Sequence, residues 1–514
     1  MVVSLVALPL ALLLYDGSSI VGLTEESTGY RYYHSLRILS TPDERPWLPQ
    51  GQLLGLAHMG LHVLLSAVGH PPTELFPRIE WWAYIAATFP ILPTVVAFWW
   101  AIRPMRSPVG LLLAAVGLLL VALDPHNFAG QAFIVPDYYA WALPAALVTA
   151  GWLVRIHSGH RLSWPALALY TGALLAMKST FVLFAFPIYL LVLLRSWRTI
   201  PCLAAAGVGG IVVGLLLIAT YYRFDVPAFR EHLVETWALM VGGSISPPVL
   251  AWITSVPKWP PPSMLLACAT PVVLLPGLLL PCRRTLIPTL LLTSVAALYS
   301  ASQRWYGATF VETTSLHYAI LLVYVSVLPW PRSRLTRAAA VVSIAIMGWI
   351  TYEHGVVTLR QGRWAAEQLT IAGRQVQTFL DAHPGKTRVL ILDNAHRPLT
   401  VDSAISKGGT DIHNRAWGVS PYVAALYPDR DYLIGETGQY ARPVTYDDVE
   451  TVVFVVGPAM GGKSIKGNKE VHEQEWAITR TWLRDSFDLD ISQWNCPVEG
   501  FAISNSLVVA CARP

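Results

Sequence analysis

Long apolar runs, separated by short loops that carry arginine, fill residues 1–351 and limit what this chain can fold into. The 514 residues are 54% hydrophobic and 13% charged, whereas soluble domains carry about 25% charged residues. We therefore expect an α-helical polytopic membrane protein with about eleven transmembrane helices, several shorter than the roughly 20 residues of a perpendicular span. The expected spans are 2–14, 81–102, 108–123, 138–155, 163–177, 180–194, 201–222, 263–281, 285–300, 314–330 and 338–351.

The arginine-bearing loops predict the orientation, because cytoplasmic loops are enriched in Lys and Arg. All of these loops fall in the cytoplasm if the N-terminus is cytoplasmic and residues 51–69 lie flat on the outer face as a juxtamembrane helix. The loops carry Arg103 and Arg106, Arg155 and Arg161, Arg195 and Arg198, Arg283 and Arg284, and Arg332, Arg334 and Arg337. We then expect the loops around 16–80, 124–137, 223–262 and 301–313, and the tail 352–514, to be extracytoplasmic.

The first helix and the loop after it contain an unusual set of carboxylates. Residues 2–14 lack a basic start and a small-residue cleavage site, so a retained helix is expected instead of a removed signal peptide. Asp16, Glu25 and Glu26 follow in a loop rich in aromatic residues. Carboxylates at the membrane surface can accept a proton or bind a cation.

The tail, residues 352–514, has the composition of a soluble domain. Apolar, β-branched segments predict strands at 388–393, 431–435, 450–457 and 504–512, and helices are expected within 355–382 and 470–487. This alternation predicts a small α/β domain. Cys496 and Cys511 would form a disulfide if the tail is extracytoplasmic, and the sequence leaves that pairing open. Cys202, Cys268 and Cys282 adjoin apolar runs and are expected to be small core residues.

Two motifs in the tail resemble ligand sites. Residues Gly457–Ser464 match the phosphate-loop pattern after a strand, but the following sequence starts a helix poorly and little chain remains for a nucleotidase fold. A glycine-rich loop is therefore the preferred interpretation. The Asp429–Asp431 and Asp488–Asp490 pairs have metal-binding spacing, which solvated loops show more often. The net charge of +4 does not indicate nucleic-acid binding.

Several segments of residues 1–350, taken in order, resemble the GT-C superfamily of integral membrane glycosyltransferases. The similarity is to its branch of protein-mannosyltransferase-like and aminoarabinose-transferase-like enzymes. The segments are Glu25-Glu26-Ser-Thr-Gly-Tyr30, the helix-like stretch 32–39, Pro49-Gln-Gly-Gln-Leu-Leu54, the loop from Gly69 to Arg78, Ile134-Val-Pro-Asp137-Tyr-Tyr139, and Ala173-Leu-Leu-Ala-Met-Lys178-Ser-Thr. The last of these is similar to the family's lysine-bearing turn between its short fifth and sixth helices.

The resemblance implies transfer of a sugar, with inversion, from a polyprenyl-phosphate donor to a glycan, lipid or protein acceptor on the outer face. Glu25 or Glu26, with Asp16 as the rival, would be the base, unless these carboxylates only cap a helix or pair with Arg31. Residues expected to bind the donor phosphate are Lys178, Arg78 and Arg304, and those expected to bind substrate are Tyr30, Asp137, Tyr138, Tyr139 and His126.

Each of these three cations could instead have a structural role and not bind phosphate. Lys178 could extend to the interface, and Arg78 and Arg304 could be interfacial anchors. No residue is assigned to a metal, and a divalent cation stays an open alternative as cofactor. The competing functional class is a transporter or a non-catalytic scaffold whose tail binds a partner. Polar residues gathered at the outer ends of the spans, and the lack of an internal repeat, favour the enzyme.

Overall fold

A computed structural model describes residues 51–69, 89–104, 141–242, 374–385, 388–392, 431–435, 449–456, 488–501 and 507–514, with a few short pieces between them. The chain divides into two compact units, with 86–359 in the first and 360–514 in the second. Most of the described residues are helical. The predicted helix at 2–14 and the predicted spans at 263–281 and 285–300 lie outside the described residues.

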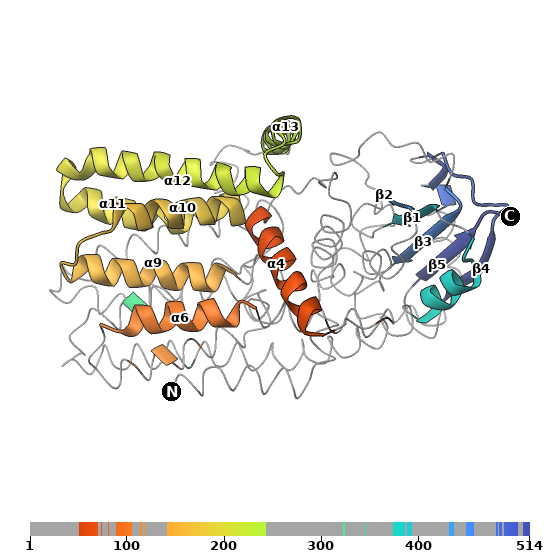
Figure 1. Ribbon diagram of the computed structural model, residues 1–514, viewed down its shortest axis with the longest axis horizontal. Coiled ribbons are helices and arrows are strands. Elements are labelled where there is room, and N and C mark those ends of the chain that lie inside the picture. The colour runs from red at the N-terminus through yellow and green to blue at the C-terminus, as the bar shows by residue number, and fades with distance from the viewer. Residues whose placement is uncertain are drawn as a thin grey trace. The chain divides into compact units, whose positions relative to one another are not determined.

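Helices in the first unit follow the predicted apolar runs, except α13, which lies in the segment predicted as the loop 223–262. They lie side by side in Figure 1, with α10 packed on α12, α6 on α9, and α11 on α9. Their bounds are α6 Ile91–Ile102, α9 Ala142–His157, α10 Trp164–Met177, the 3₁₀ turn η2 Ser179–Phe184, α11 Phe186–Arg195, the 3₁₀ turn η3 Trp197–Thr199, α12 Ile200–Tyr221 and α13 Val226–Gly242. The runs at 138–155, 163–177 and 201–222 are thereby confirmed as helical to within four residues at each end, and the run at 180–194 forms the 3₁₀ turn η2 followed by α11.

Helix α12 is the one described helix that is long and apolar enough to cross a membrane, counting η3 as its start. Its 22 residues would extend about 33 Å, close to the roughly 30 Å of a hydrocarbon core. The other apolar helices have between 10 and 17 residues. Helix α4, Gln52–Val68, is among these and matches the helix predicted at 51–69.

Small residues set the contact between α10 and α12. A Cβ atom on Gly210 would lie 2.7 Å from the Thr171 side chain, and one on Gly172 would lie 2.8 Å from the Gly210 carbonyl oxygen. A Cβ atom on Gly214 would likewise lie 2.7 Å from the Leu175 side chain. Residue numbers rise together along both helices, so α10 and α12 run parallel. Close backbone approach over small residues is typical of helix pairs in membranes.

Two predictions about the first unit are wrong. The span predicted at 81–102 is not one continuous helix, because Phe89 and Pro90 form a turn and α6 begins at Ile91. Proline lacks the amide proton that a helix interior requires. Cys202 is exposed and is not a core residue, because it lies on the first turn of α12 beside Ile200, which is also exposed.

The second unit contains a five-stranded sheet in the order β2-β1-β3-β5-β4. The strands are β1 Arg388–Leu392, β2 Asp431–Gly435, β3 Thr451–Val456, β4 Asn495–Phe501 and β5 Leu507–Ala512. β2, β1 and β3 are parallel, and β5 runs antiparallel to β3 and β4. Four strands were predicted. Sequence reasoning missed β4 because it contains Pro497 and Gly500, which an edge strand tolerates.

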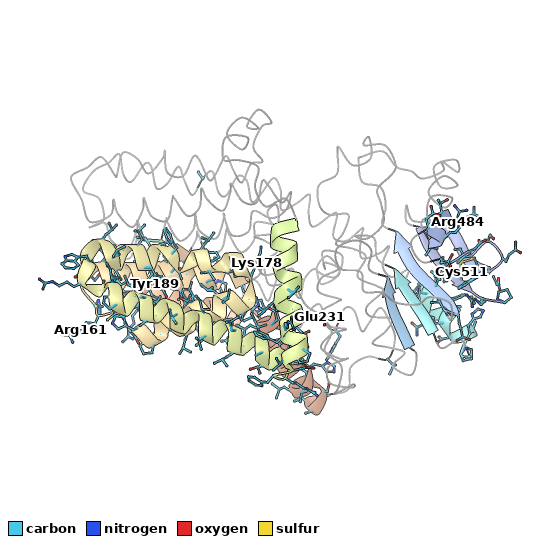
Figure 2. All side chains as sticks on the ribbon, turned by 90° about the horizontal axis from the view of Figure 1, so that it is seen from above. Arg161, Lys178, Tyr189, Glu231, Arg484 and Cys511 are labelled. Carbon is cyan, nitrogen blue, oxygen red and sulfur yellow. A yellow bond between two sulfur atoms is a disulfide. The ribbon has the colours of Figure 1, made fainter. Side chains whose placement is uncertain are left out.

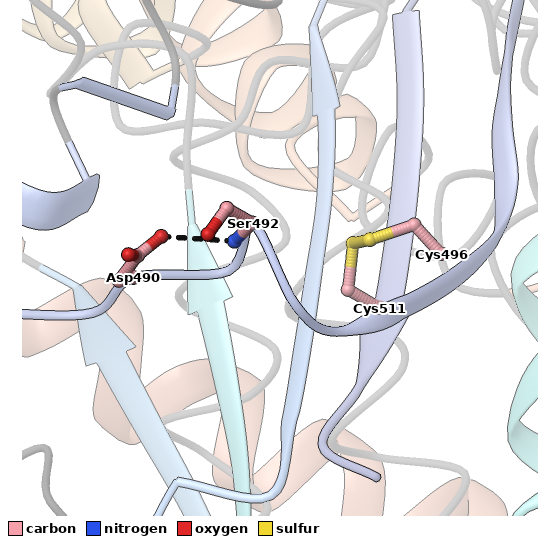
Figure 3. The surroundings of a disulfide bond; sticks show 4 residues. All are labelled: Asp490, Ser492, Cys496 and Cys511. Carbon is pink, nitrogen blue, oxygen red and sulfur yellow. Dashed lines mark hydrogen bonds between the residues drawn. A yellow bond between two sulfur atoms is a disulfide. The ribbon is translucent and has the colours of Figure 1, made fainter.

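A disulfide joins Cys496 on β4 to Cys511 on β5 (Figure 3), with their Cα atoms 4.1 Å apart. In the turn before β4, the Asp490 carboxylate accepts a hydrogen bond from the Ser492 amide at 2.9 Å. Hydrogen bonding by Ser492 lowers the pKa of Asp490. The Asp490 carboxylate therefore serves a local turn. The glycine-rich loop Gly457–Ser464 lies outside the described residues.

Candidate functional site

Lys178 lies where α10 stops and the chain turns back toward α11. Its backbone is extended, with φ −160° and ψ 131°, and its amide still donates to the Leu174 carbonyl oxygen at 2.9 Å. The polar sequence Lys178-Ser-Thr interrupts an apolar stretch, and η2 and α11 continue after it. The turn between two short helices that the sequence predicts is therefore present.

The Lys178 side chain is withdrawn from solvent, with 6% of its surface exposed. Its Nζ lies 5.7 Å from the centre of the Phe181 ring. Phe181 and Phe184 are fully buried and pack edge to face, with ring centres 5.4 Å apart. Burying an ammonium group is costly unless interactions inside the protein compensate it.

Two neighbouring hydroxyl groups, those of Thr149 and Tyr170, tie helices α9 and α10 to the turn η2. Thr149 on α9 donates to the carbonyl oxygen of Phe184 at 2.8 Å, and its hydroxyl lies 2.9 Å from the hydroxyl of Tyr170 on α10. The Tyr170 hydroxyl donates to the Ala145 carbonyl oxygen at 2.8 Å. Three elements, α9, α10 and η2, are thus held together, and η2 is the turn that directly follows Lys178.

The end of α12 adds a second buried polar pair at the same end of the bundle, since α10 and α12 are parallel. The Tyr222 hydroxyl lies 3.2 Å from Nδ1 of His232 on α13. His232 is 3% exposed, and burial lowers its pKa to about 4, so its imidazole is neutral at pH 7. We call Lys178, Tyr222 and His232 together the lysine end.

The turn into α13 is strained. Arg223 and Phe224 have positive φ values of 53° and 60°, which cost about 1–3 kcal/mol each for residues other than glycine. Their conformation redirects the chain so that α13 crosses α12, seen end-on in Figure 1 and along its length beside Glu231 in Figure 2. Strain of this size persists only where the surroundings hold it, here through the buried Tyr222–His232 pair.

The opposite end of the same helices is rich in arginine (Figure 2, near Arg161). Residue 161 precedes α10 and Lys178 follows it, so the 14 residues of α10 separate the two by about 21 Å. We call this the arginine end. It consists of Arg103, Arg155, Arg161, Arg195 and Arg198.

Of the predicted site residues, the structure describes Lys178 alone. Those outside the described residues are Asp16, Glu25, Glu26, Tyr30, Arg78, His126, Asp137, Tyr138, Tyr139 and Arg304. Within the described ranges, no group of three His, Cys, Asp or Glu side chains could hold a metal ion.

Sequence reasoning missed Thr149, Tyr170, Tyr222 and His232. Thr149 and Tyr170 could have been found as hydroxyl-bearing residues within apolar helices. Tyr222 and His232 could have been found as an aromatic residue and a histidine ten residues apart, on either side of a turn. Comparison with known proteins adds no identity: no protein-family model matches the chain, and no curated protein matches it.

Proposed function

We propose that this chain is a polytopic membrane glycosyltransferase with a GT-C-like helical domain, residues 1–351, and an extracytoplasmic α/β domain, residues 352–514. It would move a hexosyl or pentosyl group from a polyprenyl-phosphate sugar to a glycan, lipid or protein acceptor. The observation that carries the proposal is the burial of Lys178 in a turn between two short apolar helices. A buried cation at the end of an apolar bundle suits a phosphate attached to a lipid.

Exposed apolar side chains support insertion into a bilayer. Val208, Ile211, Val212 and Leu216 on α12 are about half exposed or more, and they form one stripe at helical spacing. Soluble proteins rarely expose so continuous an apolar surface. Val63, Leu64 and Val68 on α4 are also exposed, as a juxtamembrane helix at the outer interface requires.

The arrangement of cations supports the proposed sidedness. Five arginines lie at one end of the helices, which fits a cytoplasmic face, whereas Lys178, Arg223 and Arg230 lie at the other. The Cys496–Cys511 disulfide fits a tail in an oxidising compartment outside the cytoplasm. We therefore propose a multi-pass protein of the plasma (inner) membrane, with a cytoplasmic N-terminus and an extracytoplasmic C-terminal domain.

The chemistry assigns a role to each group. One carboxylate among Asp16, Glu25 and Glu26 would remove the acceptor proton, while Lys178, Arg78 and Arg304 would stabilise the departing polyprenyl phosphate. Tyr30, His126, Asp137, Tyr138 and Tyr139 would bind the sugar or the acceptor. A divalent cation as additional phosphate ligand stays open, as does a catalytically inactive scaffold or a transporter.

A transfer assay on purified protein in phosphatidylcholine nanodiscs tests the proposal. Polyprenyl-phosphate sugars are the donors, and wild type is compared with Asp16→Asn, Glu25→Gln and Glu26→Gln. We expect one variant to lose about 10²–10⁴-fold in turnover and to retain [³²P]polyprenyl phosphate. Equal turnover by all four proteins would overturn the base assignment. Folded wild-type protein that neither turns over these donors nor binds polyprenyl phosphate would favour the transporter or scaffold.

A further inference from the structure

The arginine end carries positive charge with no carboxylate close to it in sequence. Residues 99–104, 151–164 and 191–202, which form the described part of this end, contain all five of its arginines and no Asp or Glu. Soluble surfaces usually intersperse both signs of charge. A surface that collects one sign selects a partner of the opposite sign.

Two of the five arginines are used inside the fold. Arg155 donates to the carbonyl oxygens of Trp100 and Gly151 and stacks 3.8 Å from the centre of the Trp100 ring. Arg195 donates to the carbonyl oxygens of Ile156 and His157. These guanidinium groups satisfy carbonyl groups at the ends of α6 and α9, and in doing so they tie α6, α9 and α11 together.

The other three arginines point outward. The side chains of Arg103, Arg161 and Arg198 are exposed and, in the described part of the chain, make no hydrogen bond or ion pair. The Arg103 guanidinium group lies 5.5 Å from the centre of the Trp99 ring. Because Arg155 and Arg195 join the helix ends, these three charges are held on one framework. Their guanidinium groups are available for an anion from outside the chain.

Apolar side chains border these charges. Trp197 is 72% exposed beside Arg198, and Leu194 is 58% exposed one residue before Arg195. Ile200 and Trp99 are each about half exposed. A ligand that fits must therefore offer an anionic group to the guanidinium groups and hydrocarbon to the helices below. A soluble phosphate has the first property only.

We infer that the arginine end binds acidic glycerophospholipids, with Arg161 and Arg198 holding the headgroup phosphate and the exposed apolar residues contacting the acyl chains. A guanidinium group can donate two parallel hydrogen bonds to the oxygens of one phosphate. Basic patches at helix ends recognise anionic lipid headgroups. The inference rests on the membrane insertion in the proposed function, but it does not depend on the transfer reaction.

Native mass spectrometry of delipidated full-length protein, given equimolar phosphatidylglycerol and phosphatidylcholine in detergent, tests the inference. Wild type should retain phosphatidylglycerol preferentially. Arg161→Gln with Arg198→Gln should lower that preference roughly five-fold for each arginine removed, and Arg161→Lys with Arg198→Lys should keep most of it. Arg480→Gln with Arg484→Gln removes the same charge from the second unit and should have no effect.

The outcomes separate this site from the proposed donor site. Lys178→Gln should leave phosphatidylglycerol retention unchanged while it weakens binding of polyprenyl phosphate. Equal retention of both phospholipids by wild type would overturn the inference, as would an unchanged preference in the double glutamine variant when its melting temperature matches wild type. Loss of sugar transfer in Glu25→Gln with normal lipid retention would bear on the reaction alone.

Discussion

The two ends of the helical unit differ in that only the lysine end, among the described residues, buries a lysine side chain. At the arginine end, three guanidinium groups are exposed and two cap helix carbonyl groups. At the lysine end, Arg223 is exposed in the turn after α12, but the Lys178 ammonium group is 6% exposed beside buried aromatic rings. Exposed cations stay hydrated and cost little free energy, whereas a buried cation needs interactions inside the protein to offset the loss of its hydration. The contrast fits the proposed function, in which the arginine end orients the protein in the membrane and the lysine end binds the donor phosphate.

The largest effect expected from this contrast is all-or-none labelling from one side of the membrane. His160 and Arg223 are exposed at the arginine end and the lysine end respectively. In a background with Cys202, Cys268 and Cys282 replaced by Ser, a membrane-impermeant maleimide should label Arg223→Cys on intact cells. It should label His160→Cys only after permeabilisation. The reverse pattern would invert the orientation, and labelling of both sites on intact cells would break the assignment of α10 and α12 as spans.

The next largest effect should follow from removing the buried ammonium group. Lys178→Gln keeps a polar side chain of similar length but cannot stabilise a departing phosphate, so we expect kcat to fall by about 10²–10³-fold. The measurement is the transfer assay in phosphatidylcholine nanodiscs, with Arg484→Gln, an exposed cation of the second unit, as control. Lys178→Arg should recover part of the rate. Unchanged kcat and KM in Lys178→Gln would show that burial of this lysine serves packing only.

The close packing of α10 on α12, the two helices that connect the arginine end to the lysine end, predicts a smaller, purely structural effect. Gly210→Leu places side-chain atoms against Thr171 at the α10–α12 contact, where even a Cβ would lie 2.7 Å from the Thr171 side chain. We expect a loss of about 2–3 kcal/mol, measured by thermal unfolding in detergent. Gly207→Leu is the matched control on the same helix, since a Cβ there meets nothing within 4 Å. Equal destabilisation by both variants would argue against this interface.

Particular residues show how far the sequence could anticipate this contrast. The bounds of α10 and α12 were predictable because arginine, proline and polar turns interrupt their apolar runs. The direction in which Lys178 points was not, since a lysine at a helix end can bury or extend its side chain with the same local sequence. Cys202 was misjudged for a related reason: in a bilayer both core-facing and lipid-facing positions are apolar, so composition does not separate them.

Interactions between elements were also beyond the sequence. The pairing of Tyr222 with His232 depends on two positive φ values at Arg223 and Phe224, which neither residue type favours. Strand β4 was missed because Pro497 and Gly500 oppose strand formation locally, and its pairing with β5, together with the Cys496–Cys511 bond, compensates. In each case a contact between elements overrides a local preference.

The last predicted effect, similar in size to that of Gly210→Leu, concerns pH at the lysine end. Burial lowers the pKa of His232 to about 4, below its ordinary value near 6.5, so the folded state favours the neutral ring. The stability that this provides is complete above pH 6.5 and declines as pH falls toward 4, by up to about 1.4 kcal/mol per pH unit. His232→Gln should flatten that decline in melting temperature between pH 6.5 and 4.5. Tyr222→Phe removes the hydrogen bond but keeps the buried ring, so it should lower the melting temperature while retaining the slope. Parallel pH profiles for wild type and His232→Gln would mean that His232 takes up its proton as readily in the folded protein as in the unfolded chain, and that the buried Tyr222–His232 pair is not what holds the α12–α13 turn.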